Sequence, residues 1–153
     1  MSIQIGVIGA SQCSLEIERL AEEVGREIAK KKALLICGGL GGVMEASARG
    51  AKQEGGVTIG ILPGFSFEDA NPFIDIPIVT GLSHARNVLV VRSSQAIIAV
   101  EGGYGTLSEI GIALKLRKPV VGLRTWDISK KIVTVETPED AVKKAISLIK
   151  KTS

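Results

Sequence analysis

The stretch QAIIAVEGGYGTLSE, residues 95–109, joins an apolar segment to an amphipathic one through three glycines. Residues 95–100 form a short, partly β-branched apolar run, which is typical of a buried strand. Leu107, Ile110 and Leu114 then recur at the spacing of one helix face. The stretch therefore predicts a strand, a glycine turn and a helix in direct succession.

The turn between these two elements is suited to an anion. Gly102, Gly103 and Gly105 let the backbone approach a ligand without a Cβ in the way. The first N–H groups of a helix lack intrahelical partners and carry the positive end of its dipole. Thr106 adds a hydroxyl at the same place. We therefore expect a phosphate to bind at these four residues and at Tyr104, which lies between them.

The same alternation of strand and helix continues along the chain. Strands are expected at 3–8, 33–37, 57–62, 76–79, 96–100 and 120–123, and helices near 14–31, 41–54, 83–91 and 106–116. A last helix opens at Thr137-Pro138-Glu139 with a cap, a proline and an acid in order. Because the strands are continuous apolar runs, they indicate a parallel sheet covered on both faces. We predict a single α/β domain over residues 1–153, with a Rossmann-like, doubly wound parallel sheet.

Glycines follow several of these strands at their carboxyl ends, the edge where open parallel sheets bind ligands. Gly9 follows the first strand, and the segment GGLGGVM, residues 38–44, follows the second. Ordinary strand-to-helix turns also use glycine, which is an equally good interpretation of any one turn. We expect a nucleotide to contact the following residues of these two turns: Gly9, Gly38, Gly39, Gly41, Gly42 and Met44.

The segment 38–44 matches neither of the two common phosphate-binding fingerprints. It lacks the Gly-Lys-Ser/Thr ending of a Walker loop, and it lacks the GxGxxG pattern of a dinucleotide site. This pattern favours a mononucleotide over ATP hydrolysis or NAD chemistry.

Charge and composition argue against several classes of partner. The net charge is +3 and the isoelectric point is near 9.0, but the lysine runs at 30–32 and 150–151 close expected helices, where cations complement the dipole. Aromatic residues make up only 3% of the chain, so no platform for stacking bases is evident. We expect no nucleic-acid partner.

Cys13 and Cys37 match neither metal-ligand nor redox spacing, so we expect no metal site and reduced thiols. No apolar stretch approaches the roughly 20 residues of a membrane span, and no basic segment precedes the first strand. We expect a cytoplasmic protein without a membrane partner.

Arg86 and Glu109 are candidate functional residues, and each has a structural alternative. Glu109 follows Thr106 by three residues, the spacing of a capping box, in which a cap contributes about 1 kcal/mol. Arg86, taken alone, would be a surface residue, and His84 would be a satisfied polar side chain.

The residues of these motifs resemble a known family. The run 101–109 is similar to the PGGxGTxxE motif of the LONELY GUY proteins, once misnamed lysine decarboxylases, and Arg86 resembles part of their second signature. The segment 38–44 looks like their first glycine-rich loop. The string SHARNVL, residues 83–89, is most similar to a branch of this superfamily that includes molybdenum cofactor carrier proteins.

This resemblance implies a nucleotide-binding fold that assembles as a homodimer or homotetramer. In the enzymes it implies hydrolysis of a nucleoside 5′-monophosphate to a free base and ribose 5-phosphate, with Arg86 and Glu109 as the catalytic pair and no required cofactor. The alternative is a non-catalytic carrier of a nucleotide or of a phosphorylated pterin, the molybdenum cofactor.

The pair Arg86 and Glu109 favours the enzyme. Glu101, which replaces the motif's proline, and the string 83–89 favour the carrier. The apolar run 88–91 supports an oligomer, because it exceeds one core-facing stripe.

Overall fold

In the computed structural model, which describes residues 1–153, seven parallel strands form one sheet in the order β4-β3-β2-β1-β5-β6-β7. The strands are β1 (Gln4–Gly9), β2 (Leu34–Cys37), β3 (Thr58–Leu62), β4 (Ile76–Val79), β5 (Ala96–Val100), β6 (Val120–Leu123) and β7 (Ile132–Thr134). The predicted parallel α/β fold is confirmed.

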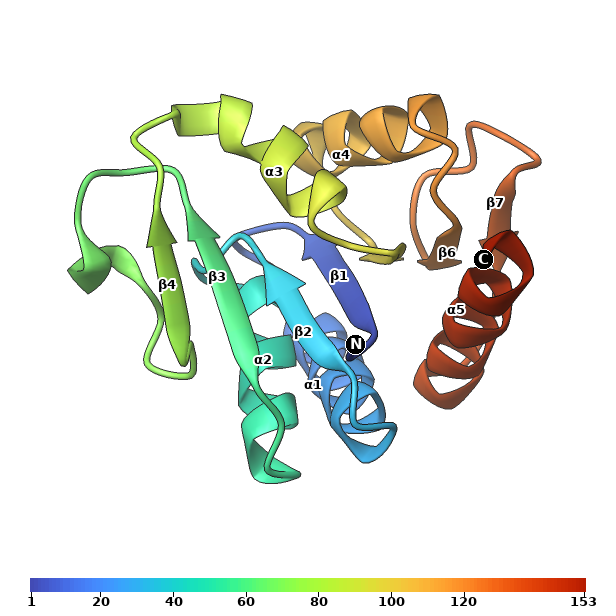
Figure 1. Cartoon of the computed structure of the whole chain (residues 1–153), viewed down its shortest axis with the longest axis horizontal. Coiled ribbons are helices and arrows are strands. Elements are labelled where there is room, and N and C mark those ends of the chain that lie inside the picture. Colours follow the sequence, from blue (N-terminus) through green and yellow to red (C-terminus); the bar gives the residue numbers. More distant parts are fainter.

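Helices cover both faces of this sheet. They are α1 (Leu15–Lys30), α2 (Val43–Gln53), α3 (Asn87–Arg92), α4 (Tyr104–Lys115) and α5 (Pro138–Thr152), with short 3-10 turns η1 (Phe67–Asp69) and η2 (Ser83–Arg86). Figure 1 shows α1, α2 and α5 on one face and α3 and α4 on the other.

The hydrophobic core consists of two layers, one on each face of the sheet. In β5, Ile98 and Val100 pack toward α1, α2 and α5, whereas Ile97 and Ala99 pack toward α3 and α4. Side chains of a strand alternate between the two faces, so a strand covered on both sides must be apolar throughout. This explains why the strands appear in the sequence as unbroken apolar runs.

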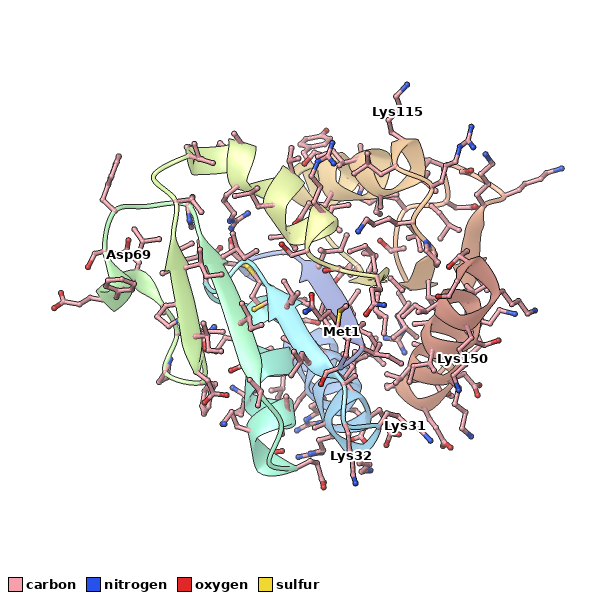
Figure 2. All side chains as sticks on the ribbon, viewed as in Figure 1. Met1, Lys31, Lys32, Asp69, Lys115 and Lys150 are labelled. Carbon is pink, nitrogen blue, oxygen red and sulfur yellow. The ribbon has the colours of Figure 1, made fainter.

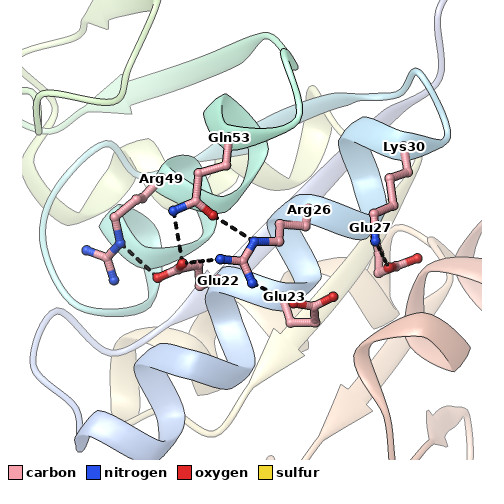
Figure 3. A network of polar contacts seen from close by, with 7 residues as sticks. All are labelled: Glu22, Glu23, Arg26, Glu27, Lys30, Arg49 and Gln53. Atoms are coloured by element: carbon pink, nitrogen blue, oxygen red, sulfur yellow. Dashed lines mark hydrogen bonds and ion pairs between the residues drawn. The ribbon is translucent and has the colours of Figure 1, made fainter.

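Helices α1 and α2 cross at unusually short range, which fixes α2 beneath the end of β1. A Cβ at Gly25 would collide with the carbonyl oxygen of Ser47, and one at Gly50 would collide with the carbonyl oxygen of Glu22. The outer side of the same crossing carries a polar network (Figure 3). There the Glu22 carboxylate accepts from Arg26 at 2.7 Å and from Arg49 at 2.8 Å, and these partners hold its pKa below the usual value despite partial burial.

The structure differs from the sequence-based expectations at residues 83–91 and at β7. The segment expected as one helix over 83–91 is a 3-10 turn that ends at Arg86, followed by α3. Strand β7 was not predicted, because a three-residue strand has too short a pattern to stand out.

The expected capping box at Thr106 and Glu109 is wrong. Helix α4 begins at Tyr104, its N-cap is Gly103, and no side chain caps it. Because the Leu107 N–H already donates to the Gly103 carbonyl at 3.0 Å, Thr106 belongs to the first turn and its side chain is buried. At α5, in contrast, the expected cap is present: the Thr137 hydroxyl accepts from the Asp140 N–H at 3.2 Å.

Most charged side chains lie on the outside of the helices and at their ends (Figure 2). Lys31 and Lys32 directly follow α1, and Lys150 lies in the last turn of α5, all exposed. This placement agrees with the helix-closing role expected for the lysine runs. None of the helices combines the length and the apolar character that crossing a membrane requires.

Candidate functional site

The candidate site lies between β1 and β5, where the strand order reverses: the chain continues from β1 toward β4 on one side and from β5 toward β7 on the other. β1 pairs with β2 on one side and with β5 on the other, so the turns that leave β1 and β5 diverge and open a crevice between them. A cavity of about 300 Å³ occupies this crevice. Of the predicted site residues, seven line it: Gly9, Met44, Arg86, Gly103, Gly105, Thr106 and Glu109. The other lining residues are Ala10, Ser11, Leu40, His84 and Asn87.

The glycine turn after β5 presents hydrogen-bond donors that have no protein partner. None of the backbone N–H groups from Gly102 to Thr106 donates to a protein acceptor; the first that does is Leu107. The Thr106 hydroxyl is also buried without a partner. Gly103 and Gly105 have open space where a Cβ would lie. This end of α4 therefore offers several free donors to an anion.

The outer side of the turn is supported by the loop after β6. The Trp126 indole N–H donates to the Gly103 carbonyl at 3.1 Å, and the Thr125 hydroxyl donates to the Glu101 carbonyl at 2.7 Å. Tyr104 stacks on Trp126 with ring centroids 6.1 Å apart and is 83% exposed. Neither Tyr104 nor Glu101 lines the cavity. The carboxylate that replaces the motif's proline thus lies outside the crevice.

Arg86 is buried at the cavity. The alternative interpretation, that it is an exposed surface residue, is therefore wrong. Its side chain is 9% exposed, one guanidinium nitrogen donates to the Asn87 side-chain oxygen, and its Nε has no partner. Gly38 makes room for it, since a Cβ there would lie 2.7 Å from Nη2 of Arg86. Burial lowers the pKa of Arg86, while the opposite charge of Glu109 raises it.

Glu109 lies in the same cavity and is 7% exposed. Its carboxylate forms no hydrogen bond or ion pair with any protein group. Burial raises the pKa of Glu109 to about 7, although the nearby charge of Arg86 lowers it. A carboxyl group with such a pKa changes its ionisation near neutral pH, as the acids and bases of active sites do.

Asn87 and His84 also line the cavity, although neither was predicted from the sequence to belong to the site. Asn87 is 6% exposed and hydrogen-bonds both Arg86 and Ser108. Asn87 directly follows Arg86 and directly precedes the apolar run 88–91. This position of a polar residue is the one signal in the sequence that could have identified it. His84 is exposed and forms no hydrogen bond, so it is not the satisfied side chain that was expected.

The remaining predicted glycines do not line the cavity: Gly102 lies in the turn after β5, with a φ angle of +105°, and the others shape the turn after β2. Gly39 and Gly42 have φ angles of +78° and +61°, a region that side chains rarely adopt. A Cβ at Gly42 would also collide with the carbonyl oxygen of Ala10. Gly41 approaches the carbonyl of Ser11. This turn therefore packs directly against the turn after β1.

Comparisons with known proteins show which family the chain belongs to. The sequence model of the SLOG cluster4 family matches residues 2–151. A protein from Archaeoglobus fulgidus is 53% identical over 95% of each chain. A cytokinin riboside 5′-monophosphate phosphoribohydrolase from Mycobacterium tuberculosis is 35% identical over 76% of this chain and 67% of its own. These matches support the resemblance to the LONELY GUY proteins.

A solved structure is similar over nearly the whole chain. The molybdenum cofactor binding protein from Rippkaea orientalis superposes with a TM-score of 0.92 at 37% identity, covering 97% of this chain and 98% of its own. The branch expected from residues 83–89 is thus confirmed by the structure as well. The chain belongs to the SLOG cluster4 family, within the LONELY GUY and lysine decarboxylase-like superfamily and near the molybdenum cofactor carrier proteins.

Proposed function

We propose that this chain hydrolyses the N-glycosidic bond of a nucleoside 5′-monophosphate and releases a free base and ribose 5-phosphate. The observation that carries the proposal is the burial of Arg86 and Glu109 in one cavity, beside a turn of unpaired N–H groups. A buried carboxyl that ionises near neutral pH, next to a buried cation and an anion-binding turn, is the arrangement that such a reaction needs.

The phosphate group would bind at the turn after β5. Gly103, Gly105 and Thr106 supply backbone N–H groups at the positive end of the α4 dipole, and the Thr106 hydroxyl is a further unpaired donor. Arg86 supplies a positive charge and an Nε without a partner. These donors together hold the ribose phosphate and position its anomeric carbon.

The bond between C1′ and the base nitrogen breaks with its electron pair leaving on the base, and positive charge develops on the ribose. The Glu109 carboxylate, in its ionised form, stabilises this charge and orients the water that adds to C1′. One proton of that water stays on the new hydroxyl, and the other goes to the departing base. Because Glu109 accepts no hydrogen bond from the protein, both of its oxygens are available for these tasks.

The test is an assay of ribose 5-phosphate release from a panel of nucleoside 5′-monophosphates. We expect release from at least one member of the panel. The control is Gln95→Leu, which removes a hydrogen bond to the Gln4 N–H at the opposite end of β5 and should leave the release rate unchanged.

A second candidate function is binding of the molybdenum cofactor, a phosphorylated pterin, as cargo and without turnover. The similarity to the Rippkaea protein over the whole chain favours it. The same turn and Thr106 would bind the phosphate of the pterin.

The two functions are distinguished by the same assay combined with a binding measurement. Binding of nucleotides with ribose 5-phosphate release supports the hydrolase. Binding of a phosphorylated pterin, with no release from any nucleotide of the panel, supports the carrier and rejects the hydrolase.

A further inference from the structure

Asn87 links the helix of Arg86 to the anion-binding turn. Its side-chain oxygen accepts from the guanidinium of Arg86, and its amide nitrogen donates to the Ser108 hydroxyl at 3.0 Å. Ser108 in turn donates to the Gly105 carbonyl at 2.7 Å. Three hydrogen bonds thus connect the guanidinium, through Asn87, to the first turn of α4.

Arg86 and Glu109 do not form an ion pair, although both are buried in the same cavity. No nitrogen of Arg86 lies within 4.0 Å of a Glu109 oxygen, and Nε of Arg86 has no partner at all. Opposite charges attract strongly where water is excluded, so a flexible arginine would be expected to close onto the carboxylate. Asn87 provides the only hydrogen bond that holds the Arg86 side chain in its place.

We propose that Asn87 is a positioning residue that keeps the Arg86 guanidinium out of a direct ion pair with Glu109. Both charged groups then remain available to a ligand. The use of these groups in hydrolysis rests on the proposed function, but the geometry that Asn87 imposes does not.

The separation of Arg86 from Glu109 should affect the pKa of Glu109, which a titration measures. A direct ion pair lowers the pKa of a carboxyl by roughly 1 to 3 pH units. Besides Arg86, the ionisable groups that face Glu109 are the buried Cys37 thiol on β2 and His84 at the cavity. Burial raises the pKa of Cys37 to about 12, so this thiol stays neutral while Glu109 titrates.

The experiment is a ¹³C NMR titration of the Glu109 carboxyl in the full-length protein without ligand. Asn87→Leu keeps a side chain of similar size but removes the hydrogen-bond acceptor. We expect the pKa of Glu109 to fall by at least about one pH unit in this variant. Gln95→Leu is the matched control, since Gln95 accepts from the Gln4 N–H far from the cavity, and it should leave the pKa of Glu109 unchanged.

A second variant tests whether the hydrogen-bond acceptor of Asn87 is the part of the side chain that matters. Asn87→Asp keeps an acceptor for Arg86 and adds a negative charge, so the pKa of Glu109 should not fall. An unchanged pKa of Glu109 in Asn87→Leu, or a fall of one unit or more in Asn87→Asp, would overturn the proposal. If Asn87→Leu does not fold, Asn87→Ala, which also removes the acceptor, replaces it in the titration with the same expected fall in the pKa of Glu109.

Binding gives an independent readout. Inorganic phosphate should bind about tenfold more weakly to Asn87→Leu than to the unmodified protein, because Arg86 donors would be engaged by Glu109. Equal phosphate affinity in the two proteins would contradict the proposal. Neither measurement depends on turnover, so an absence of hydrolysis would reject the proposed function and leave this inference standing.

Discussion

Glu109 occupies an environment that costs stability at neutral pH. Burial raises its pKa from 4.5 to about 7, so between these values the folded protein holds a proton that the unfolded chain has released. Stability therefore falls as pH rises from about 4.5 to 7, and the loss of about 3 kcal/mol is complete above pH 7. A buried carboxyl that is kept at such a cost is typical of a site selected for function.

Glu109→Gln should therefore stabilise the protein in a pH-dependent way. The glutamine keeps the shape of the side chain but cannot ionise. We expect its melting temperature to exceed that of the unmodified protein by several degrees at pH 8 and by little at pH 5. Thermal unfolding followed by circular dichroism at both pH values measures this. A lower melting temperature of the variant at pH 8 would indicate that Glu109 has a structural role.

Thr106→Val tests whether the Thr106 hydroxyl contributes to anion binding at the turn after β5. The Thr106 hydroxyl is buried without a partner, and such a group costs about 1 to 3 kcal/mol. The isosteric valine should leave the melting temperature unchanged or raise it, while phosphate binding weakens about tenfold, the loss of one hydrogen bond to a charged group. The fluorescence of Trp126, the only tryptophan, can report binding because its indole N–H donates to Gly103 in this turn. Unaltered phosphate affinity would exclude the hydroxyl from the anion site.

At the scale of elements, the crossing of α1 and α2 depends on the absence of side chains. Gly50→Ala would force the two helices apart, because its Cβ would meet the Glu22 carbonyl, and should destabilise the protein by about 1 to 3 kcal/mol. Gly111→Ala is the matched control: Gly111 is exposed in α4 with nothing near its Cβ, so alanine should stabilise by up to about 1 kcal/mol. Urea unfolding of both variants measures the difference. Equal effects of the two substitutions would contradict the close crossing.

The strands and most helices could be predicted from the sequence because their apolar periodicity is strong. The start of α4 could not: Thr106 and Glu109 match a capping box in spacing, but the helix begins two residues earlier, at Tyr104, and both side chains are buried. The burial of Arg86 was equally hidden, since it depends on the space left by Gly38 in the turn after β2, which only the assembled fold brings against this side chain. Local pattern thus predicts elements, whereas the site depends on contacts between them.

At the scale of the whole molecule, the run 88–91 does not supply the oligomer surface that was expected of it, because Val90 and Val91 are buried in the core. We propose instead a homo-oligomer that forms through the β4 edge of the sheet. Five of the ten exposed large hydrophobic residues cluster in this region of the chain: Phe65, Phe67, Ile76, Ile78 and Leu82. Ile76 and Ile78 are in register with Ile59 and Ile61 of β3, so they lie on the sheet face that α3 and α4 cover only in part.

Light scattering at micromolar concentration should give a mass of at least two chains, each of 16.1 kDa. Ile78→Lys should lower this mass to that of one chain by placing a charge in the apolar surface. Ile128→Lys, at an exposed isoleucine in the loop between β6 and β7, should leave the mass unchanged. A single-chain mass of the unmodified protein would reject the oligomer.

The proposed hydrolysis depends on the Glu109 carboxylate, which stabilises positive charge on a ribose bound at the glycine turn. The most direct test measures ribose 5-phosphate release by the unmodified protein and by Glu109→Gln, at saturating concentration of the best nucleotide. We predict a fall in turnover of at least about 100-fold, with nucleotide still bound, because one electrostatic stabiliser is lost. Full turnover by Glu109→Gln, or no release of ribose 5-phosphate by the unmodified protein, would contradict the claim.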